Sequence, residues 1–568
     1  MNFSKKQNLL WLAISLLMSF LLSLRATARV FQYDFVIQDD ARQHVVWFEQ
    51  YLDKYLFQGD MIADYFQSVA PPGYSYLYKT IGFLGISPIQ ASKLLPILLY
   101  VLTAFFCYRL TIKLFKFPTG GFFSTSILLY TLLFQTDISS ATPRAFLNLF
   151  LLAFLYSLTC GSRLGSWFSL LFLGLYYPQA MLVAAGTGIL SLFRLNGWRI
   201  KLTSDKNLMG LVIGVIAIAL VFSAYFLLLR DSEFGPVVTR VQALVDPAYL
   251  KGGRSSFFSE SALEFWLLGG RSGLVPGGFL FFQPRLLLVC LLLPFLWVFR
   301  RDFPLIKQVS KRISILLRLL IASVFLYSAA HFLLFKLHLP SRYTQHGIRI
   351  IMAILSGITL AILVDAVRIW LARSTINFVR AISPFVYLTF VALILIYPVY
   401  LNQTDADFPK PGYVIGRYPK IYQFFSEQPK DTLVASLSKE VANIPAFSTR
   451  SVLVAPEYGV AYHRGYYEKF RQKVKDLMAA TFSEDKELLN QFIEQYGVDF
   501  FMLEKEIFAE GYFIENNDWP MEYEAFIEAI KKGTEPRSAL AATVGTCTAL
   551  ESKNMLVLDA VCVTEHSK

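Results

Sequence analysis

Long apolar runs recur along the first four hundred residues of the chain and are separated by short polar segments. A run of about 17 to 25 apolar residues can cross the hydrocarbon core of a bilayer as an α-helix. Eleven such runs, several of them short, lie at approximately 7–24, 91–112, 119–136, 143–160, 164–177, 179–193, 207–229, 280–299, 313–335, 347–367 and 382–401. Residues 1–401 are therefore predicted to form a polytopic α-helical membrane domain with about eleven transmembrane helices.

The apolar stretch from Gly165 to Phe193 has two interpretations, one long helix or two short helices hinged at Tyr176-Tyr177-Pro178-Gln179. Lys and Arg gather on the cytoplasmic side of membrane proteins, which distinguishes the two. With two helices, all the basic clusters between the runs fall on one side: Lys5/Lys6, Lys113/Lys116, Arg163, Arg194/Arg199/Lys201/Lys206, Arg300/Arg301/Lys307/Lys311/Arg312 and Arg368/Arg373/Arg380. We therefore predict two helices, a cytoplasmic N-terminus and an exported C-terminal part.

On this topology the exported segments are residues 25–90, 137–142, 230–279 and 336–346, together with the C-terminal domain, 402–568. The first apolar run and Ala26-Thr27-Ala28 also resemble a signal peptide with its cleavage site. Arg25 interrupts the approach to that site, so we expect the run to be retained. Cleavage would leave the remaining topology unchanged.

From about Asn402 the chain alternates short apolar runs with amphipathic patterns, which predicts a small extracytoplasmic α/β domain. Strands are predicted at 432–437, 451–455, 498–503 and 555–563, and helices at 466–482 and 486–496. Cys547 and Cys562 lie in this exported domain, where a disulfide is chemically permitted. The other three cysteines lie in apolar runs and are expected to be packing residues.

The composition agrees with a membrane protein. Hydrophobic residues make up 55% of the 568 residues and charged residues 17%, against roughly 25% charged residues in soluble proteins. The net charge of +12 divides into +19 over residues 1–401 and −7 over residues 402–568. This basic excess is typical of positive-inside topology, so we expect contact with membrane lipids and no nucleic-acid partner.

Acidic residues are concentrated in the first exported loop. Seven of the sixteen in residues 1–401 lie between Asp34 and Asp64, and a carboxylate close to lipid is costly unless it has a partner or a function. From Asp39 onward the pattern is helical, so Asp39 lies near a helix N-terminus, where the dipole stabilises the anion that a general base requires. The alternative is a helix cap with a solvated acidic face.

The order of these features resembles the GT-C class of membrane glycosyltransferases, and most closely the bacterial aminoarabinose transferases and protein O-mannosyltransferases. Asp39-Asp40 matches their acidic pair, Arg42 follows where relatives often have a basic residue, and Pro71-Pro72-Gly73-Tyr74 matches their Pro-Pro turn. The second acidic residue is Asp rather than Glu, so either carboxylate is a candidate for catalysis. The resemblance is architectural over residues 1–401 and reaches motif level only over about 34–80.

The resemblance implies a sugar donor linked to polyprenyl phosphate and a lipid, glycan or protein acceptor at the outer face of a bacterial inner (plasma) membrane. Asp39 or Asp40 would accept the acceptor proton during an inverting transfer. The leaving phosphate needs cationic stabilisation, by Arg or Lys or by a divalent ion such as Mg²⁺ or Mn²⁺ at Asp39 and Asp40. The sequence contains no nucleotide-binding signature, in agreement with a lipid-linked donor.

Further substrate-binding candidates lie at the predicted outer face. Asp137 resembles a second acidic position of some family members, and Arg342-Tyr343 resembles a phosphate-contacting segment. The Gly-containing loop 230–279 suits a segment that orders over a substrate. The candidates are Arg42, His44, Tyr74, Asp137, Arg144, Arg254, Arg271, Arg342 and Tyr343, and the loop offers Arg240 and Lys251 as further cations. The alternative for each cation is a snorkelling interfacial side chain, and His44 could either ligate a metal with Asp40 or form a hydrogen bond.

Two other segments are candidates for a substrate cavity. The Tyr176–Gln179 hinge could line it, since irregular backbone at membrane depth requires protein or water to satisfy it, although a plain helical hairpin is the alternative. In the C-terminal domain, Glu457, His463 and Arg464 are polar residues beside a strand end and are candidates for acceptor recognition only.

Two other functions compete with glycosyl transfer. An O-antigen polymerase or ligase would depend on basic and His residues rather than on an acidic pair after the first span. A transporter or flippase of lipid-linked sugars would place charged residues near the bilayer midplane and show repeated halves. Acidic residues are nearly absent from the apolar runs, with Asp137 and Asp365 at their ends. A glycosyltransferase is therefore the function that the sequence favours.

Overall fold

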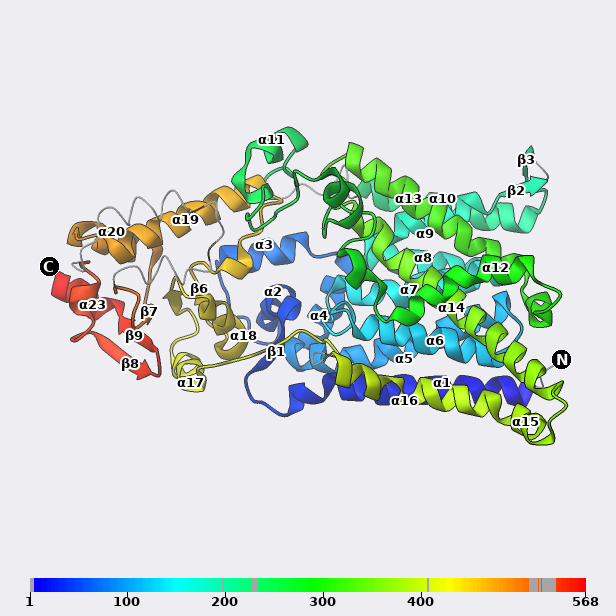
Figure 1. Cartoon of the computed structure of the whole chain (residues 1–568). Coiled ribbons are helices and arrows are strands. Elements are labelled where there is room, and N and C mark those ends of the chain that lie inside the picture. The colour runs from blue at the N-terminus through cyan, green and yellow to red at the C-terminus, as the bar shows by residue number, and fades with distance from the viewer. Residues whose placement is uncertain are drawn as a thin grey trace.

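The computed structural model describes residues 5–196, 199–225, 233–405, 408–509, 519, 523 and 538–567. It is elongated, with a bundle of long helices at one end and a smaller domain that contains a β-sheet at the other (Figure 1). The N-terminus lies at the far end of the bundle and the C-terminus at the opposite tip of the molecule. The first loop, residues 28–87, contributes helices that lie between the two parts.

The helices of the bundle follow the predicted apolar runs. They are α1 (Lys5–Thr27), α5 (Pro88–Leu114), α6 (Pro118–Leu133), α7 (Leu147–Cys160), α8 (Arg163–Tyr176), α9 (Pro178–Leu190), α10 (Lys206–Ala224), α12 (Leu293–Val298), α13 (Ser314–Phe332), α14 (Ser341–Ala372), α15 (Asn377–Ile382) and α16 (Val386–Thr404). Within the described residues, seven helical segments are long and apolar enough to span a bilayer. The protein is therefore a multi-pass membrane protein, and the count of eleven spans stays a prediction.

Two predicted runs differ from regular spans. In the run 280–299, Arg285–Leu292 is a 3₁₀ helix and α12 begins only at Leu293. Pro284 and Pro294 interrupt this run, and proline cannot donate the backbone N–H that an interior helix position requires. In the run 207–229, residues 226–229 lie outside the described residues.

Residues 165–193 form two helices, as predicted from the distribution of charge. α8 ends at Tyr176 and α9 begins at Pro178, because a residue before proline is disfavoured in a helix whereas proline is favoured at a helix start. The hairpin of β2 (Phe193–Asn196) and β3 (Arg199–Leu202) follows α9 and lies at the same end of the bundle as the N-terminus and α15 (Figure 1). Three of the predicted cytoplasmic clusters therefore share one end of the bundle.

The first loop folds into short elements: β1 (Val36–Gln38), α2 (Asp39–His44), a 3₁₀ turn (Val46–Tyr51), α3 (Met61–Val69) and α4 (Pro72–Phe83). The helix predicted from Asp39 is α2, but its cap is the preceding residue. Gln38 Oε1 accepts a hydrogen bond from the Ala41 N–H at 3.0 Å. The interpretation of Asp39 as the cap is therefore wrong, and both carboxylates of the acidic pair are available to other groups.

A five-stranded sheet forms the C-terminal domain, in the order β6-β5-β7-β9-β8. Its strands are β5 (Leu433–Ala435), β6 (Ser451–Val452), β7 (Phe500–Glu504), β8 (Thr548–Ser552) and β9 (Met555–Asp559). β5 pairs in parallel with β6 and β7, whereas β9 pairs antiparallel with β7 and β8. The helices are α17 (Pro419–Glu427), α18 (Ile444–Ser448), α19 (Arg464–Phe482), α20 (Lys486–Tyr496) and α23 (Ala560–Ser567).

Most elements predicted for this domain are present, and α20 has the predicted bounds. The strand predicted at 555–563 is wrong beyond Asp559, where α23 begins. The carboxylate of Asp559 accepts hydrogen bonds from the N–H groups of Val561 and Cys562 at 2.9 and 3.1 Å. This side chain satisfies donors at a helix start and so ends the strand. β8 is not among the predicted strands.

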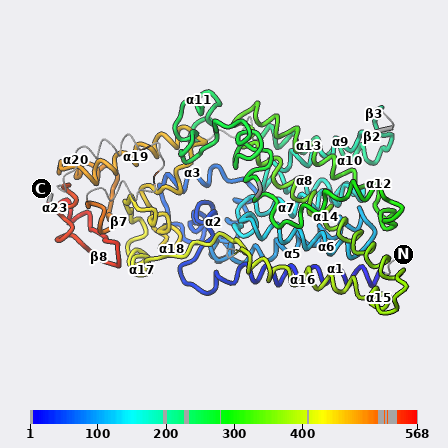
Figure 2. The backbone as a smooth tube through the Cα atoms, in the orientation of Figure 1, coloured from blue at the N-terminus to red at the C-terminus, as the bar shows by residue number. Residues whose placement is uncertain are grey.

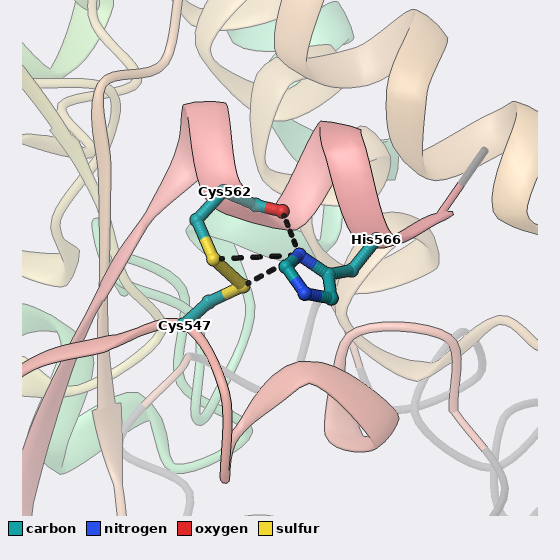
Figure 3. Close-up of side chains that lie close together, drawn as sticks. All are labelled: Cys547, Cys562 and His566. Atoms are coloured by element: carbon teal, nitrogen blue, oxygen red, sulfur yellow. Dashed lines mark hydrogen bonds between the residues drawn. A yellow bond between two sulfur atoms is a disulfide. The ribbon is translucent and has the colours of Figure 1, made fainter.

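Cys547 and Cys562 form a disulfide that joins the segment before β8 to α23 (Figure 3). His566 lies one helical turn after Cys562, with its Nδ1 atom 3.7 and 3.6 Å from the two sulfurs. In the part of the chain that the structure describes, these three side chains form the only group of three His, Cys, Asp or Glu ligands close enough to share a metal ion. While the sulfurs are bonded to each other they are not thiolate ligands.

Two connections hold the C-terminal domain against the bundle side of the molecule. β1 pairs antiparallel with β4 (Tyr413–Ile415), which follows α16, and the Asp39 N–H donates to the Gly412 carbonyl at 2.9 Å. The segment after α10 also reaches this domain, and α11 (Arg240–Val245) lies near the end of α19 (Figure 2). Tyr249 Oη donates to the Ala461 carbonyl at 2.6 Å. The acidic pair is thus fixed at the junction of the two parts.

Candidate functional site

A cavity of about 690 Å³ lies at this junction. Its walls come from the first loop, the ends of several bundle helices, the 254–271 segment and the C-terminal domain. Of the predicted site residues, those that line it are Asp39, Asp40, His44, Arg144, Arg254, Arg271, Arg342 and Tyr343. Tyr177, Pro178 and Gln179 of the predicted hinge also line it. Side chains that are hundreds of residues apart in the sequence therefore face one space.

Asp40 is held by Arg144. The two side chains form an ion pair, and both are largely buried. Arg144 follows Thr142-Pro143 at the start of a 3₁₀ turn (Pro143–Phe146) that leads into α7. Its Nε atom lies 3.4 Å from Asp137 Oδ1, and its NH2 group also donates to Thr136 Oγ1 at 3.3 Å. One guanidinium group therefore bridges two carboxylates from different loops.

Asp39 has different surroundings from its neighbour. Its side chain is 50% exposed, and Oδ1 accepts a hydrogen bond from Arg42 at 2.6 Å. Its Oδ2 atom makes no hydrogen bond within the described residues. Consecutive residues of an α-helix point about 100° apart, which explains why adjacent carboxylates meet different partners. Asp39 thus has one carboxylate oxygen bound by Arg42 and the other open.

The C-terminal domain adds a carboxylate to the cavity wall. Glu457, in a 3₁₀ turn (Pro456–Tyr458), lies 3.5 Å from Arg42 and 3.4 Å from Arg254. Burial raises the pKa of Glu457, although the two arginines oppose that shift. Arg42 also donates to Asn443 Oδ1 at 2.8 Å and does not itself line the cavity. Arg42 therefore links Asp39 to the C-terminal domain.

The arginines of the cavity differ in how they are satisfied. Arg254 donates to the carbonyl groups of Pro456 and Glu457 at 3.1 and 3.0 Å. Arg271 donates to the carbonyl groups of Arg254 and Ser256 at 3.2 Å, and so shapes the loop. Arg342, at the start of α14, has no side-chain hydrogen bond or ion pair among the described residues. Its guanidinium group is therefore available to a bound anion.

Three predicted site residues lie behind the cavity wall rather than in it. Tyr74 is fully buried and its hydroxyl donates to the His44 carbonyl at 3.3 Å. Asp137 is buried and pairs with His346 Nδ1 at 3.4 Å as well as with Arg144. Arg42 is the third of these residues. These residues do not line the cavity and position those that do. Gly73 is required where α4 approaches α8, since a Cβ atom there would lie 2.7 Å from Leu175 Cβ.

His44 and Tyr343 also line the cavity. The His44 ring packs edge-on against Phe66, with 5.4 Å between ring centroids. Burial lowers the pKa of His44 to about 4, with Asp40 opposing and Arg144 reinforcing the shift, so the imidazole is neutral near pH 7. The Tyr343 hydroxyl donates to the Leu337 carbonyl at 2.8 Å.

Several cavity residues were not predicted as site residues: Gln43, Lys336 and His338. Glu457 and His463, which the sequence predicts as candidates for acceptor recognition only, both line the cavity. Glu457 is the single charged residue in the apolar stretch from Val452 to Val460. That isolated charge was the signal from which its place in a site could have been inferred.

A helical bundle, a first loop that carries an acidic pair and a small sheet-containing domain around one cavity define a polytopic membrane protein with the GT-C glycosyltransferase fold. No protein-family model and no curated protein matches the sequence. The archaeal oligosaccharyltransferase AglB from Archaeoglobus fulgidus, in complex with an inhibitory peptide and a dolichol-phosphate, is similar in structure, with a TM-score of 0.53 and 12% identity over 89% of this chain and 70% of that chain.

The Archaeoglobus fulgidus oligosaccharyltransferase in its apo form gives a TM-score of 0.50 and 13% identity, over 90% of this chain and 71% of that chain. The arabinofuranosyltransferase AftD from Mycobacteria gives a TM-score of 0.46 and 11% identity, over 89% of this chain and 37% of that chain. At such identities, the likeness to the archaeal enzyme shows a shared fold. The fold class that the sequence resemblance predicted is confirmed.

Proposed function

We propose that this protein transfers a sugar from a polyprenyl-phosphate-linked donor to an acceptor bound in the cavity, with inversion at the anomeric carbon. The observation that carries the proposal is a half-exposed carboxylate, Asp39, in the same cavity as an unpaired cation, Arg342. Glycosyl transfer from a lipid phosphate needs a base for the acceptor and positive charge for the leaving group. The archaeal structure of the same fold contains a dolichol-phosphate, which supports a donor of this kind.

Asp39 is the general base in this proposal. Arg42 binds Oδ1, so Oδ2 is left to accept the proton of an acceptor hydroxyl or amine. The acceptor oxygen or nitrogen then forms its bond to the anomeric carbon as the bond from that carbon to the phosphate oxygen breaks. Asp40 is occupied by Arg144 and serves to hold that arginine.

Arg342 binds the leaving phosphate. An arginine presents its N–H donors in a planar fork that suits two phosphate oxygens at once. Arg342 is the second residue of α14 and lines the cavity together with residues 335–339. The electron pair of the broken bond stays on the phosphate oxygen, whose added negative charge the guanidinium stabilises.

The acceptor, a lipid, glycan or protein, binds on the side of the C-terminal domain, where Glu457 and His463 line the cavity. The cavity faces the outer side of a bacterial inner membrane, and the basic end of the bundle faces the cytoplasm. This orientation follows from the positive-inside rule.

The test measures transfer of radiolabelled sugar from polyprenyl-phosphate sugars by the purified full-length protein in nanodiscs. Asp39→Asn should lower turnover at least about 100-fold, the usual contribution of a general base. Asp53→Asn is the matched control, since Asp53 pairs with Lys430 on the surface of the first loop, away from the cavity. Full turnover by Asp39→Asn would show that Asp39 is not the base.

A further inference from the structure

In the Asp40–Arg144–Asp137 cluster, one cation bridges two carboxylates. Asp40 comes from α2 and Asp137 from the connection between α6 and the 3₁₀ turn that follows, and the Arg144 guanidinium contacts both. Asp137 is 6% exposed and is held from its other side by His346. The Ser140 hydroxyl, which donates to the Asp137 carbonyl at 2.7 Å, fixes the same loop. The two carboxylates therefore converge on a single positive charge.

A divalent ion does not fit beside that charge. Mg²⁺ and Mn²⁺ need several oxygen ligands that are free to coordinate. Asp40 and Asp137 are engaged by Arg144, and one oxygen of Asp39 is engaged by Arg42. Within the described residues, no three His, Cys, Asp or Glu ligand atoms come close enough at the cavity to share an ion. The metal position predicted at Asp39 and Asp40 is therefore not supported by the geometry.

Arg144 supplies the positive charge that a metal ion at this position would provide. Arg144 lines the cavity, so its positive charge acts on the space in which a phosphate would leave. The two carboxylates hold it in place before any substrate binds, so little reorganisation is required. Arginine keeps its charge at all relevant pH values, which makes the cation permanent.

We propose that Arg144 takes the place of a divalent cation in this protein, bridging Asp40 and Asp137, and that the site works without a metal ion. The inference about turnover rests on the proposed glycosyl transfer, whereas the inference about cation binding does not. Removal of the guanidinium should leave two converging carboxylates and so create a metal site that the wild type does not have.

The binding experiment uses Mn²⁺ as the probe and the purified full-length protein in detergent. Electron paramagnetic resonance and thermal melting report Mn²⁺ binding without any sugar transfer. The wild type should bind no Mn²⁺ at 1:1 stoichiometry in the range up to about 0.1 mM, a concentration typical of moderate protein sites. Arg144→Ala should bind one Mn²⁺, with a rise in melting temperature, and Asp40→Asn in that background should abolish the binding.

Arg109→Gln is the matched control, because Arg109 is an exposed arginine that donates to Tyr156 outside the cavity. It should bind no Mn²⁺, like the wild type. One Mn²⁺ bound by the wild type and lost in Asp40→Asn would overturn the proposal. A folded Arg144→Ala variant that gains no Mn²⁺ site would overturn it as well.

Turnover gives the second readout. Wild-type transfer should be unchanged in EDTA. The Arg144→Ala variant should lose at least about 100-fold in turnover, as expected for loss of one electrostatic stabiliser. Millimolar Mn²⁺ should restore part of that turnover. Loss of wild-type turnover in EDTA with recovery in Mn²⁺ would overturn the proposal. If no lipid-linked donor supports turnover while the Mn²⁺ experiments behave as stated, the proposed function fails and the assignment of Arg144 stands.

Discussion

The link from Arg42 to the C-terminal domain gives the most demanding prediction. The Arg42 side chain is 11% exposed and contacts Asp39 at 2.6 Å, Asn443 at 2.8 Å and Glu457 at 3.5 Å. Arg42→Gln removes the charged donors from all three. Hydrogen bonds to charged groups contribute about 1.5–3 kcal/mol each, but the half-exposed Asp39 regains water and Glu457 keeps Arg254. We therefore expect a loss of about 2–4 kcal/mol.

The matched control is Arg464→Gln. Arg464 forms an ion pair with Glu468 on the surface of α19, where the two side chains are 57% and 56% exposed. Pairs of this kind contribute about 0.3–0.5 kcal/mol, because water screens both charges and the side chains lose entropy. The two substitutions remove the same group, so a difference between them reports the burial and number of the contacts.

Thermal unfolding in detergent, followed by tryptophan fluorescence, measures both variants. Trp47 is buried at the same junction, with its ring centroid 5.3 Å from that of Tyr458. For a unit of the size of the C-terminal domain, residues 402–568, about 1 kcal/mol shifts the melting temperature by about 2–4 °C, so Arg42→Gln should lower it by at least about 4 °C and the control by about 2 °C or less. Combined with Glu457→Gln, Arg42→Gln should have a smaller effect than on its own, since the two residues share a contact. A shift no larger than that of the control would refute the role of Arg42 as the link.

Three further predictions concern the first loop and the C-terminal domain. Burial lowers the pKa of His44 to about 4, below the value of about 6.5 in the unfolded chain, so protons favour the unfolded state as the pH falls from 6.5 to 4. The free energy of unfolding should therefore fall by on the order of 2 kcal/mol at pH 5. The difference between the melting temperatures at pH 7.5 and pH 5 should be smaller in His44→Gln than in the wild type. Replacement of Cys547 and Cys562 by Ser opens a loop with a sequence separation of 15 and should cost about 3 kcal/mol; an unchanged melting temperature would contradict a stabilising disulfide. Gly73→Ala places a Cβ 2.7 Å from a side chain of α8 and should cost about 1–3 kcal/mol, whereas Gly270→Ala, with nothing within 4 Å, should melt like the wild type.

Much of the helical part could be predicted because its signals are local. The length of an apolar run determines whether a helix can cross a bilayer, and a proline such as Pro178 determines where a helix starts. The basic clusters by themselves favour two helices over one at residues 165–193. In the C-terminal domain the apolar pattern does not predict the start of α23, because Asp559 ends a strand through side-chain hydrogen bonds that this pattern does not contain. β8 has only two apolar residues, Ala549 and Leu550, among its five, so its strand signal is weak.

The sequence by itself determined the class of fold and the segment that holds the acidic pair, since apolar length, charge distribution and motif order are all present along the chain. Only the tertiary structure decided which partner each carboxylate of the acidic pair contacts. Asp39 turns to the open cavity and to Arg42, whereas Asp40 turns to Arg144, a residue 104 positions away. Neighbours on a helix point in different directions, and each carboxylate takes its properties from whichever distant residue the fold places opposite it. The separation of 401 positions between Arg42 and Asn443 shows why no local pattern could have predicted those partners.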